Sequence, residues 1–180
     1  MIGVVQMRKI YIVLSFTGTW LSRAVRIYTG KEFSHVSISL DKDLDYMYSF
    51  GRLNVNNPFW GGFVHEAQNK GVFKKFYNTE SVIYPIEVNE QQYKKIKKSI
   101  KRFKATKDLY SFNMIGLIGA GLNIRISRKN KFYCAEFVKY ILDNAGVDLE
   151  LPDVVKPQDF FDASNGKFIY RGKFNEYNSL

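Results

Sequence analysis

One cysteine, Cys134, is present among the 180 residues of the chain. A single thiol excludes a disulfide framework within the chain, and with only two histidines beside it we expect no metal site and no cofactor. The chain must therefore fold around a hydrophobic core. Its hydrophobic content of 46% and aromatic content of 16% are enough for one compact domain, which we expect to span residues 1–180.

The same cysteine lies where a helix is predicted to begin. Apolar residues recur at helical spacing over 135–145, and Gly146 follows as a left-handed stop. Cys134 precedes Phe137 and Val138 by three and four residues, so its side chain is predicted to lie on the same inward face. The N–H groups and the positive dipole end of the first helical turn favour a thiolate and offer donors to an oxyanion. The alternative is a small core residue, because free cysteine is commonly buried.

A histidine lies well before the cysteine, in a segment with the pattern of a strand. Apolar and polar residues alternate over 34–40, which places His35 on the face that carries small polar side chains. A thiol and an imidazole are the nucleophile and the base of cysteine hydrolases, and we predict these roles for Cys134 and His35. The alternative for His35 is a structural histidine.

Three segments resemble the circularly permuted papain-like cysteine hydrolases of the NlpC-type superfamily, among which the YiiX/YaeF-like amidases are most similar. These segments are His35–Leu40, Tyr48–Arg52 and Tyr133–Phe137, and the resemblance spans residues 8–165. It implies an α+β, permuted papain-like fold, in which an antiparallel sheet packs against a helix that carries the cysteine at its N-terminus. It also implies that the histidine strand precedes the cysteine helix, the reverse of papain.

The identity of the residue that orients the imidazole does not follow from the sequence. Relatives commonly place a polar residue on the strand after the histidine strand, but the segment Tyr46–Phe50 contains no carboxylate, amide or histidine. The register of the hairpin decides whether the hydroxyl of Tyr48 or that of Ser49 shares the face of His35. Glu66, from the following loop, or a main-chain carbonyl is the alternative.

Further residues are candidates for contact with the substrate. Tyr133 either donates a hydrogen bond to the substrate carbonyl or packs, and His65 and Glu66 follow a glycine pair in a position to line a pocket. Glu136 is explained by the dipole of the helix in whose first turn it lies.

The rest of the chain is predicted to alternate between strands and helices. Asn89 and Gln92 are spaced as a capping box, and Pro85 suggests an edge strand or a bulge. The remaining elements are expected as strands over 10–15, 81–88 and 167–171, helices over 19–28, 90–104 and 157–161, and a turn-rich segment over 54–62.

The net charge of +10 favours binding to an anionic partner. Basic residues cover the outer face of the helix over 90–104, which would suit a cell-wall polymer or an acidic lipid, although a solvated face is the more ordinary explanation. Nucleic acid is not favoured, since no nucleic-acid fold signature accompanies the charge. The apolar segment over 112–124, followed by basic residues, is either a membrane contact or an acyl-chain site, or else an ordinary buried helix and loop.

Three functions follow from these observations. The first is a thiol hydrolase that cleaves an amide or peptide bond, including cell-wall or isopeptide bonds, through an acyl-enzyme on Cys134. The second transfers the acyl group to a lipid or an amine, as lecithin:retinol acyltransferase-like proteins do. The third is a non-catalytic basic module. For the first two the partner is an amide- or acyl-containing substrate, and we expect a cytoplasmic protein with peripheral membrane association, because no signal peptide or spanning segment is convincing.

Overall fold

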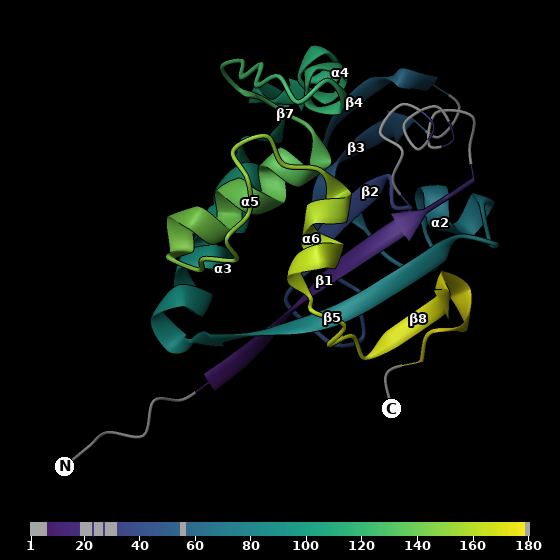
Figure 1. Ribbon diagram of the computed structural model, residues 1–180, viewed down its shortest axis with the longest axis vertical. Helices are drawn as coiled ribbons and strands as arrows, with labels where there is room; N and C mark the ends of the chain where they lie inside the picture. Colours follow the sequence, from purple (N-terminus) through teal and green to yellow (C-terminus); the bar gives the residue numbers. More distant parts are fainter. Residues whose placement is uncertain (1–6, 19–22, 24–26, 28–31, 55–56, 179–180) are drawn as a thin grey trace.

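A six-stranded antiparallel sheet forms the centre of the fold, in the order β4-β3-β2-β1-β5-β8 (Figure 1). The computed structural model describes residues 7–18, 23, 27, 32–54 and 57–178. The helix expected over 19–28 lies outside the described residues, apart from Arg23 and Ile27. The strands of the sheet are β1 (Met7–Phe16), β2 (His35–Ser39), β3 (Met47–Asn54), β4 (Asn57–Glu66), β5 (Glu80–Asn89) and β8 (Tyr170–Lys173).

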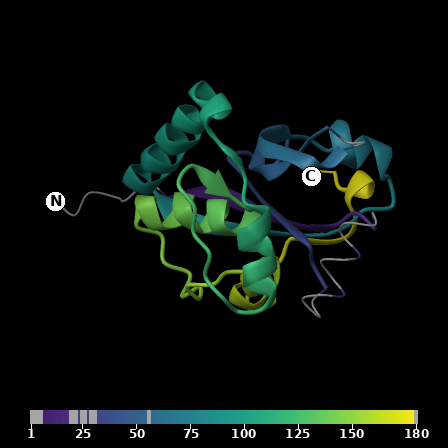
Figure 2. The ribbon, with the colours of Figure 1, turned by 90° about the horizontal axis from the view of Figure 1, so that it is seen from above.

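Helices cover this sheet, so the fold is of the mixed α+β class. Figure 2 shows α3 and α5 towards one end of the sheet and α2 towards the other. A short parallel pair, β6 (Ser111–Phe112) and β7 (Lys131–Phe132), brackets the segment that contains α4. The helices are α2 (Gly71–Lys75), α3 (Glu90–Ala105), α4 (Met114–Gly121), α5 (Cys134–Ala145) and α6 (Pro157–Ala163), with 3₁₀ turns η1 (Lys107–Leu109) and η2 (Phe174–Glu176).

The main core lies between the sheet and α3, α5 and α6. Phe50 on β3 is fully buried in its centre, with ring centroids 5.2 Å from Phe137 on α5 and 6.1 Å from Phe103 on α3. A second, smaller core covers the opposite face of the sheet, where Phe73 on α2 packs on Phe174 at 4.7 Å. Both faces of the sheet are therefore occupied.

The helix α3 follows the sequence pattern closely. The side chain of Asn89 accepts a hydrogen bond from the N–H of Gln92, and the Gln92 side chain accepts one from the N–H of Asn89, so the predicted capping box is confirmed.

Pro85 lies in β5 opposite Tyr11 of β1, beyond the residues of β5 that pair with β8. The missing N–H of this proline therefore interrupts no ladder with β8.

Two expectations are wrong in detail. The stretch over 54–62 is not a run of turns, because β4 begins at Asn57 and pairs with β3 through its two glycines. The apolar stretch over 112–124 is not an ordinary buried helix, because Ile115 and Ile118 on α4 are each 50% exposed. No helix among the described residues has both the length and the apolar character needed to cross a bilayer.

Candidate active site

A histidine and a glutamate meet at one end of β2. The Nε2 atom of His35 lies 3.0 Å and 3.1 Å from the two carboxylate oxygens of Glu66. The hydroxyl of Ser37 donates to Glu66 Oε2 at 2.5 Å and lies 3.3 Å from the same ring nitrogen. The side chains of His35 and Glu66 are only 18% and 14% exposed. Burial and bidentate geometry make this a strong, well-oriented pair.

The β3–β4 hairpin brings Glu66 to His35. Glu66 is the last residue of β4 and pairs with Met47, which in turn pairs with Ser39 of β2, so the carboxylate returns to the face of the sheet that carries His35. Gly51 of β3 lies under the pair: an added Cβ there would be 3.6 Å from His35 Cε1 and 3.7 Å from Glu66 Oε1.

The charges of the pair follow from its surroundings. Burial alone would lower the pKa of His35, but the attraction of the Glu66 carboxylate and the interactions of the protonated ring with Cys134 and Glu66 outweigh burial and raise this pKa to about 10. Burial alone would raise the pKa of Glu66, whereas His35 and Ser37 together lower it below its ordinary value. At neutral pH the pair is an imidazolium and a carboxylate.

Cys134 is the neighbour of His35 on its other side. Cys134 lies close enough to the imidazole to contribute to the raised pKa of His35, and it is 3% exposed at the start of α5. The helix α5 packs against both β2 and β3, and these two strands pair only at Ile38↔Tyr48 and Ser39↔Met47. The thiol, the ring and the carboxylate thus form a chain of three groups.

The residues that flank the thiol have structural partners. The hydroxyl of Tyr133 donates to the carbonyl of Val155 at 2.9 Å and is buried, so it packs against the core and does not point to a substrate. Glu136 reaches back to the backbone of Tyr133 and to the side chain of Asn113, and burial raises the pKa of its carboxyl. Its Oε2 atom is buried without a hydrogen-bond partner.

The structure brings neither hydroxyl proposed as the orienter onto the His35 ring. The register Ile38↔Tyr48 puts Tyr48 on the opposite face from His35, where it stacks on Phe63 at 5.9 Å. Ser49 has the parity of His35, but its hydroxyl donates to the carbonyl of Val36 at 2.6 Å. Among the candidates, the residue hydrogen-bonded to the imidazole is Glu66.

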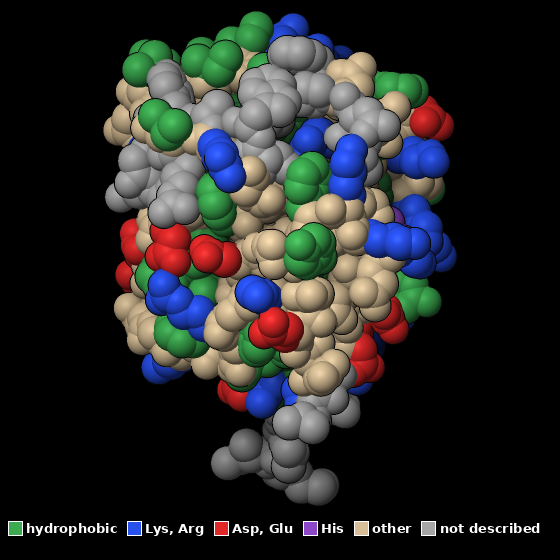
Figure 3. All heavy atoms as spheres, turned by 90° about the vertical axis from the view of Figure 1, so that its right-hand side faces the viewer, with side chains coloured by type: hydrophobic (Ala, Val, Ile, Leu, Met, Phe, Trp, Pro, Cys, Tyr) green, Lys and Arg blue, Asp and Glu red, His purple; other side chains and the backbone are tan. Residues whose placement is uncertain are grey.

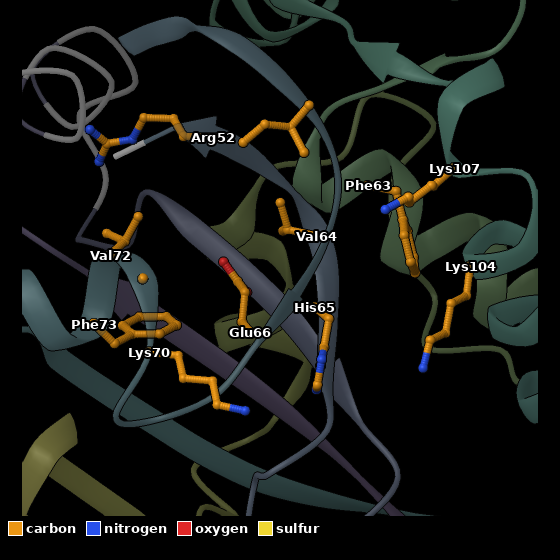
Figure 4. Close-up of a pocket in the computed structure, with 12 residues that line it drawn as sticks. Arg52, Phe63, Val64, His65, Glu66, Lys70, Val72, Phe73, Lys104 and Lys107 are labelled. Carbon is orange, nitrogen blue, oxygen red and sulfur yellow. The ribbon is translucent and has the colours of Figure 1, made fainter. Parts of the chain in front are cut away.

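The second histidine is separate from this chain of groups. His65 Nε2 lies 3.0 Å from the carbonyl of Asp45, and its ring stacks between Tyr46 and Tyr48, both at 5.4 Å. It helps to line a cavity of about 470 Å³ that also reaches Glu66 (Figure 4). The lining of this cavity includes neither Cys134 nor His35.

This cavity combines an apolar wall with basic residues. Figure 4 shows the Glu66 carboxylate near its centre, with the cationic side chains of Arg52, Lys70, Lys104 and Lys107 around it. Phe63 and Phe73 supply aromatic surface. The predicted substrate-contact residues His65 and Glu66 therefore share one cavity, whereas Tyr133 does not line it.

One member of the cluster was missed by the sequence reasoning. Ser37 holds the Glu66 carboxylate, and it lies two residues after His35 on the same strand. The signal was present in the sequence, because alternate residues of a strand share a face and the residues over 34–40 alternate between apolar and polar.

Comparisons with known protein families, with curated proteins and with solved structures found no match to this chain.

Proposed function

We propose that the chain is a thiol hydrolase of permuted papain-like architecture that cleaves an amide bond through an acyl-enzyme on Cys134. One observation carries the proposal: the buried His35 ring is hydrogen-bonded to the Glu66 carboxylate and interacts electrostatically with Cys134. A nucleophile, a base and a group that orients the base are the parts of a catalytic triad.

The charge on His35 assigns the proton transfers. Because the raised pKa keeps the imidazole protonated at neutral pH, His35 is the acid that protonates the leaving amine. The thiolate attacks the amide carbon, and the imidazolium gives its proton to the leaving amine as the C–N bond breaks. His35 then takes a proton from water, which attacks the thioester and releases the acid and the thiolate.

The start of α5 supplies donors for the oxyanion. The first N–H groups of a helix have no partner within it, and Tyr133 at the N-cap provides no side-chain acceptor for them. The N–H of Cys134 itself therefore points to where negative charge develops on the carbonyl oxygen. The dipole of a helix 12 residues long adds to this attraction.

The substrate is an amide of the peptide, isopeptide or cell-wall type, and the cavity beside Glu66 offers apolar and cationic surface next to the triad. An acyltransferase would form the same thioester, with an amine or a lipid in the place of water as acceptor. The nature of the acceptor decides between hydrolysis and transfer once the thioester is formed.

Alkylation of the thiol by iodoacetamide tests the proposal directly, because Cys134 is the sole cysteine. We expect native protein to react near neutral pH at a rate above that of an unstructured thiol, whose pKa is about 8.5. His35→Ala should slow the reaction by about tenfold or more at that pH, because the imidazolium that stabilises the thiolate is lost. The measurement is the rate of carbamidomethylation by mass spectrometry across the pH range.

The control is the same protein in urea, where all variants should react as ordinary thiols. Cys134→Ser gives the blank. If native Cys134 reacts only after denaturation, it is a structural residue of the core and the hydrolase proposal fails. If His35→Ala reacts like the wild type, the imidazole does not activate the thiol and a non-catalytic basic module takes its place.

A further inference from the structure

The short helix α4 differs from an ordinary surface helix in which of its residues are buried. Its buried side is made of small residues and its exposed side of large aliphatic ones. The buried small residues are Gly116, Gly119 and Ala120. The exposed side chains of α4 and of the residues that follow it, together called the α4 face, are Ile115 (50%), Ile118 (50%), Leu122 (60%) and Ile124 (53%).

The glycines fix this orientation. An added Cβ on Gly119 would lie 2.7 Å from the carbonyl oxygen of Ile124 and 2.8 Å from the side chain of Ile126, so a larger residue does not fit. Asn113 packs as closely on Gly116 and accepts from its N–H at 3.0 Å as the helix cap. The helix therefore cannot turn its large residues inward while this packing is kept.

Only cations accompany the α4 face in the sequence. No aspartate or glutamate occurs between Leu109 and Ala135, whereas Arg125, Arg128 and Lys129 are exposed directly after the face. In the described part of the chain, no ion pair with a carboxylate includes Arg128 or Lys129. An apolar surface followed in the sequence by exposed cations is complementary to a surface of acyl chains beneath anionic headgroups.

An exposed tryptophan lies beside this segment. Trp60 on β4 is 60% exposed and precedes Gly61, whose backbone packs on Phe112 just before α4. Tryptophan is the residue that most commonly lies at the level of lipid headgroups. Figure 3 shows hydrophobic and basic side chains together at the top of the molecule, the end that carries α4 in Figure 1.

We propose that this end of the protein docks on an anionic lipid surface. The α4 face enters the boundary between headgroups and acyl chains, and Arg125, Arg128 and Lys129 contact the anionic headgroups. The segment leads through β7 into α5, so docking places the start of α5, with Cys134, close to the membrane. The docking itself does not depend on thiol chemistry.

Flotation with vesicles tests this inference. The full chain should bind vesicles of phosphatidylcholine with about a third phosphatidylserine and should not bind phosphatidylcholine alone. Ile115→Ser with Leu122→Ser should weaken binding by roughly tenfold or more, because apolar area no longer enters the interface. Arg125→Gln with Arg128→Gln should weaken it by roughly twenty-five-fold, at about fivefold for each cation near the surface.

Two matched controls separate the α4 face from general properties of the chain. Lys98→Gln with Arg102→Gln removes the same charge from the outer side of α3, and Tyr77→Ser with Ile169→Ser removes exposed apolar residues elsewhere. Both should bind like the wild type. Cys134→Ser should also bind like the wild type, so a failure of the hydrolase proposal leaves this result unchanged.

Three outcomes would overturn the inference. Equal binding to neutral vesicles would show that the cations do not select the surface. Equal loss in the α3 control would show that net charge alone drives binding. A dimer in the absence of vesicles that Ile115→Ser with Leu122→Ser dissociates would show that a second copy of the chain covers the α4 face.

Discussion

Glu66 fixes both the direction and the charge of the His35 ring. Its two oxygens, at 3.0 Å and 3.1 Å from Nε2, hold the imidazole from one side, and the Ser37 hydroxyl holds the carboxylate in turn. A neutral orienter such as a serine would also fix the ring, but it would not keep the proton on it. The anionic partner thus keeps the imidazole positively charged at neutral pH.

Replacing Glu66 with glutamine separates these two effects. Glu66→Gln keeps the size and a hydrogen-bonding oxygen but removes the negative charge, so the pKa of His35 falls. We expect the alkylation of Cys134 near neutral pH to slow by about tenfold to a hundredfold, and the rise of its rate to move to higher pH. The profile of rate against pH is the measurement.

Ser49→Ala and Tyr48→Phe are the matched comparisons for that variant. Both should keep the wild-type alkylation profile, since neither hydroxyl contacts the imidazole, while loss of the Ser49 bond to Val36 should cost about 1 kcal/mol of unfolding free energy. A slow Ser49→Ala beside a normal Glu66→Gln would assign the orienting role to Ser49.

The ion pair should also make the free energy of unfolding depend on pH. The folded pKa of His35 is raised from 6.5 to about 10, so its contribution is full below about pH 6.5 and is lost as the pH rises through about 10. The pKa of Glu66 is lowered from 4.5, so its contribution is present above that pH and is lost in acid. Urea unfolding should show wild type more stable than Glu66→Gln by about 1–3 kcal/mol at about pH 6, and less so at about pH 10. A gap that widens from neutral to alkaline pH would contradict the assigned charges.

Among the elements, α3 has the best-defined start. Its capping box satisfies the N–H groups of both Asn89 and Gln92, and the Gln92 amide also donates to the carbonyl of Gly146 at the end of α5 at 2.8 Å. The cap therefore ties two helices of the main core together. This contact lies at the opposite end of α5 from Cys134.

Asn89→Ala should lower the free energy of unfolding by about 1 kcal/mol, because the N–H of Gln92 loses its acceptor. Urea titration followed by circular dichroism measures the change. The exposed neighbour Gln91→Ala should stay within about 0.5 kcal/mol of the wild type. The alkylation rate of Cys134 should be the same in all three proteins, and a change in that rate would mean that the cap is coupled to the thiol.

Elements with a strong internal period could be predicted from the sequence, and elements shaped by their neighbours could not. The buried stripe of α3 and the apolar period of α5 are visible in the residues themselves. The glycines of β4 suggested turns, yet Gly61 is required because an added Cβ would lie 2.8 Å from Phe112, a contact made far along the chain. Which side of α4 faces outward likewise depends on packing that local composition does not reveal.

At the scale of the whole molecule, the site depends on register. Residue type and local pattern were sufficient to nominate Cys134 and His35, because an isolated thiol and a histidine on a polar strand face are conspicuous. The partner of the imidazole was left among several candidates, because Glu66 reaches it only through the pairing of Met47 with both Ser39 and Glu66. The irregular loop over 41–45 gives no turn chemistry from which that register follows.

The order of strands in the sheet also has a consequence for synthesis of the protein. The imidazole and the carboxylate are contributed by β2 and β4, whereas the thiol arrives with α5, after β5 has closed on β1. As the chain leaves the ribosome, the segments that carry His35 and Glu66 emerge before Cys134 has been translated. The cysteine is thus added after five of the six strands of the sheet, which limits the time that it spends exposed to oxidants and electrophiles on an unfolded nascent chain.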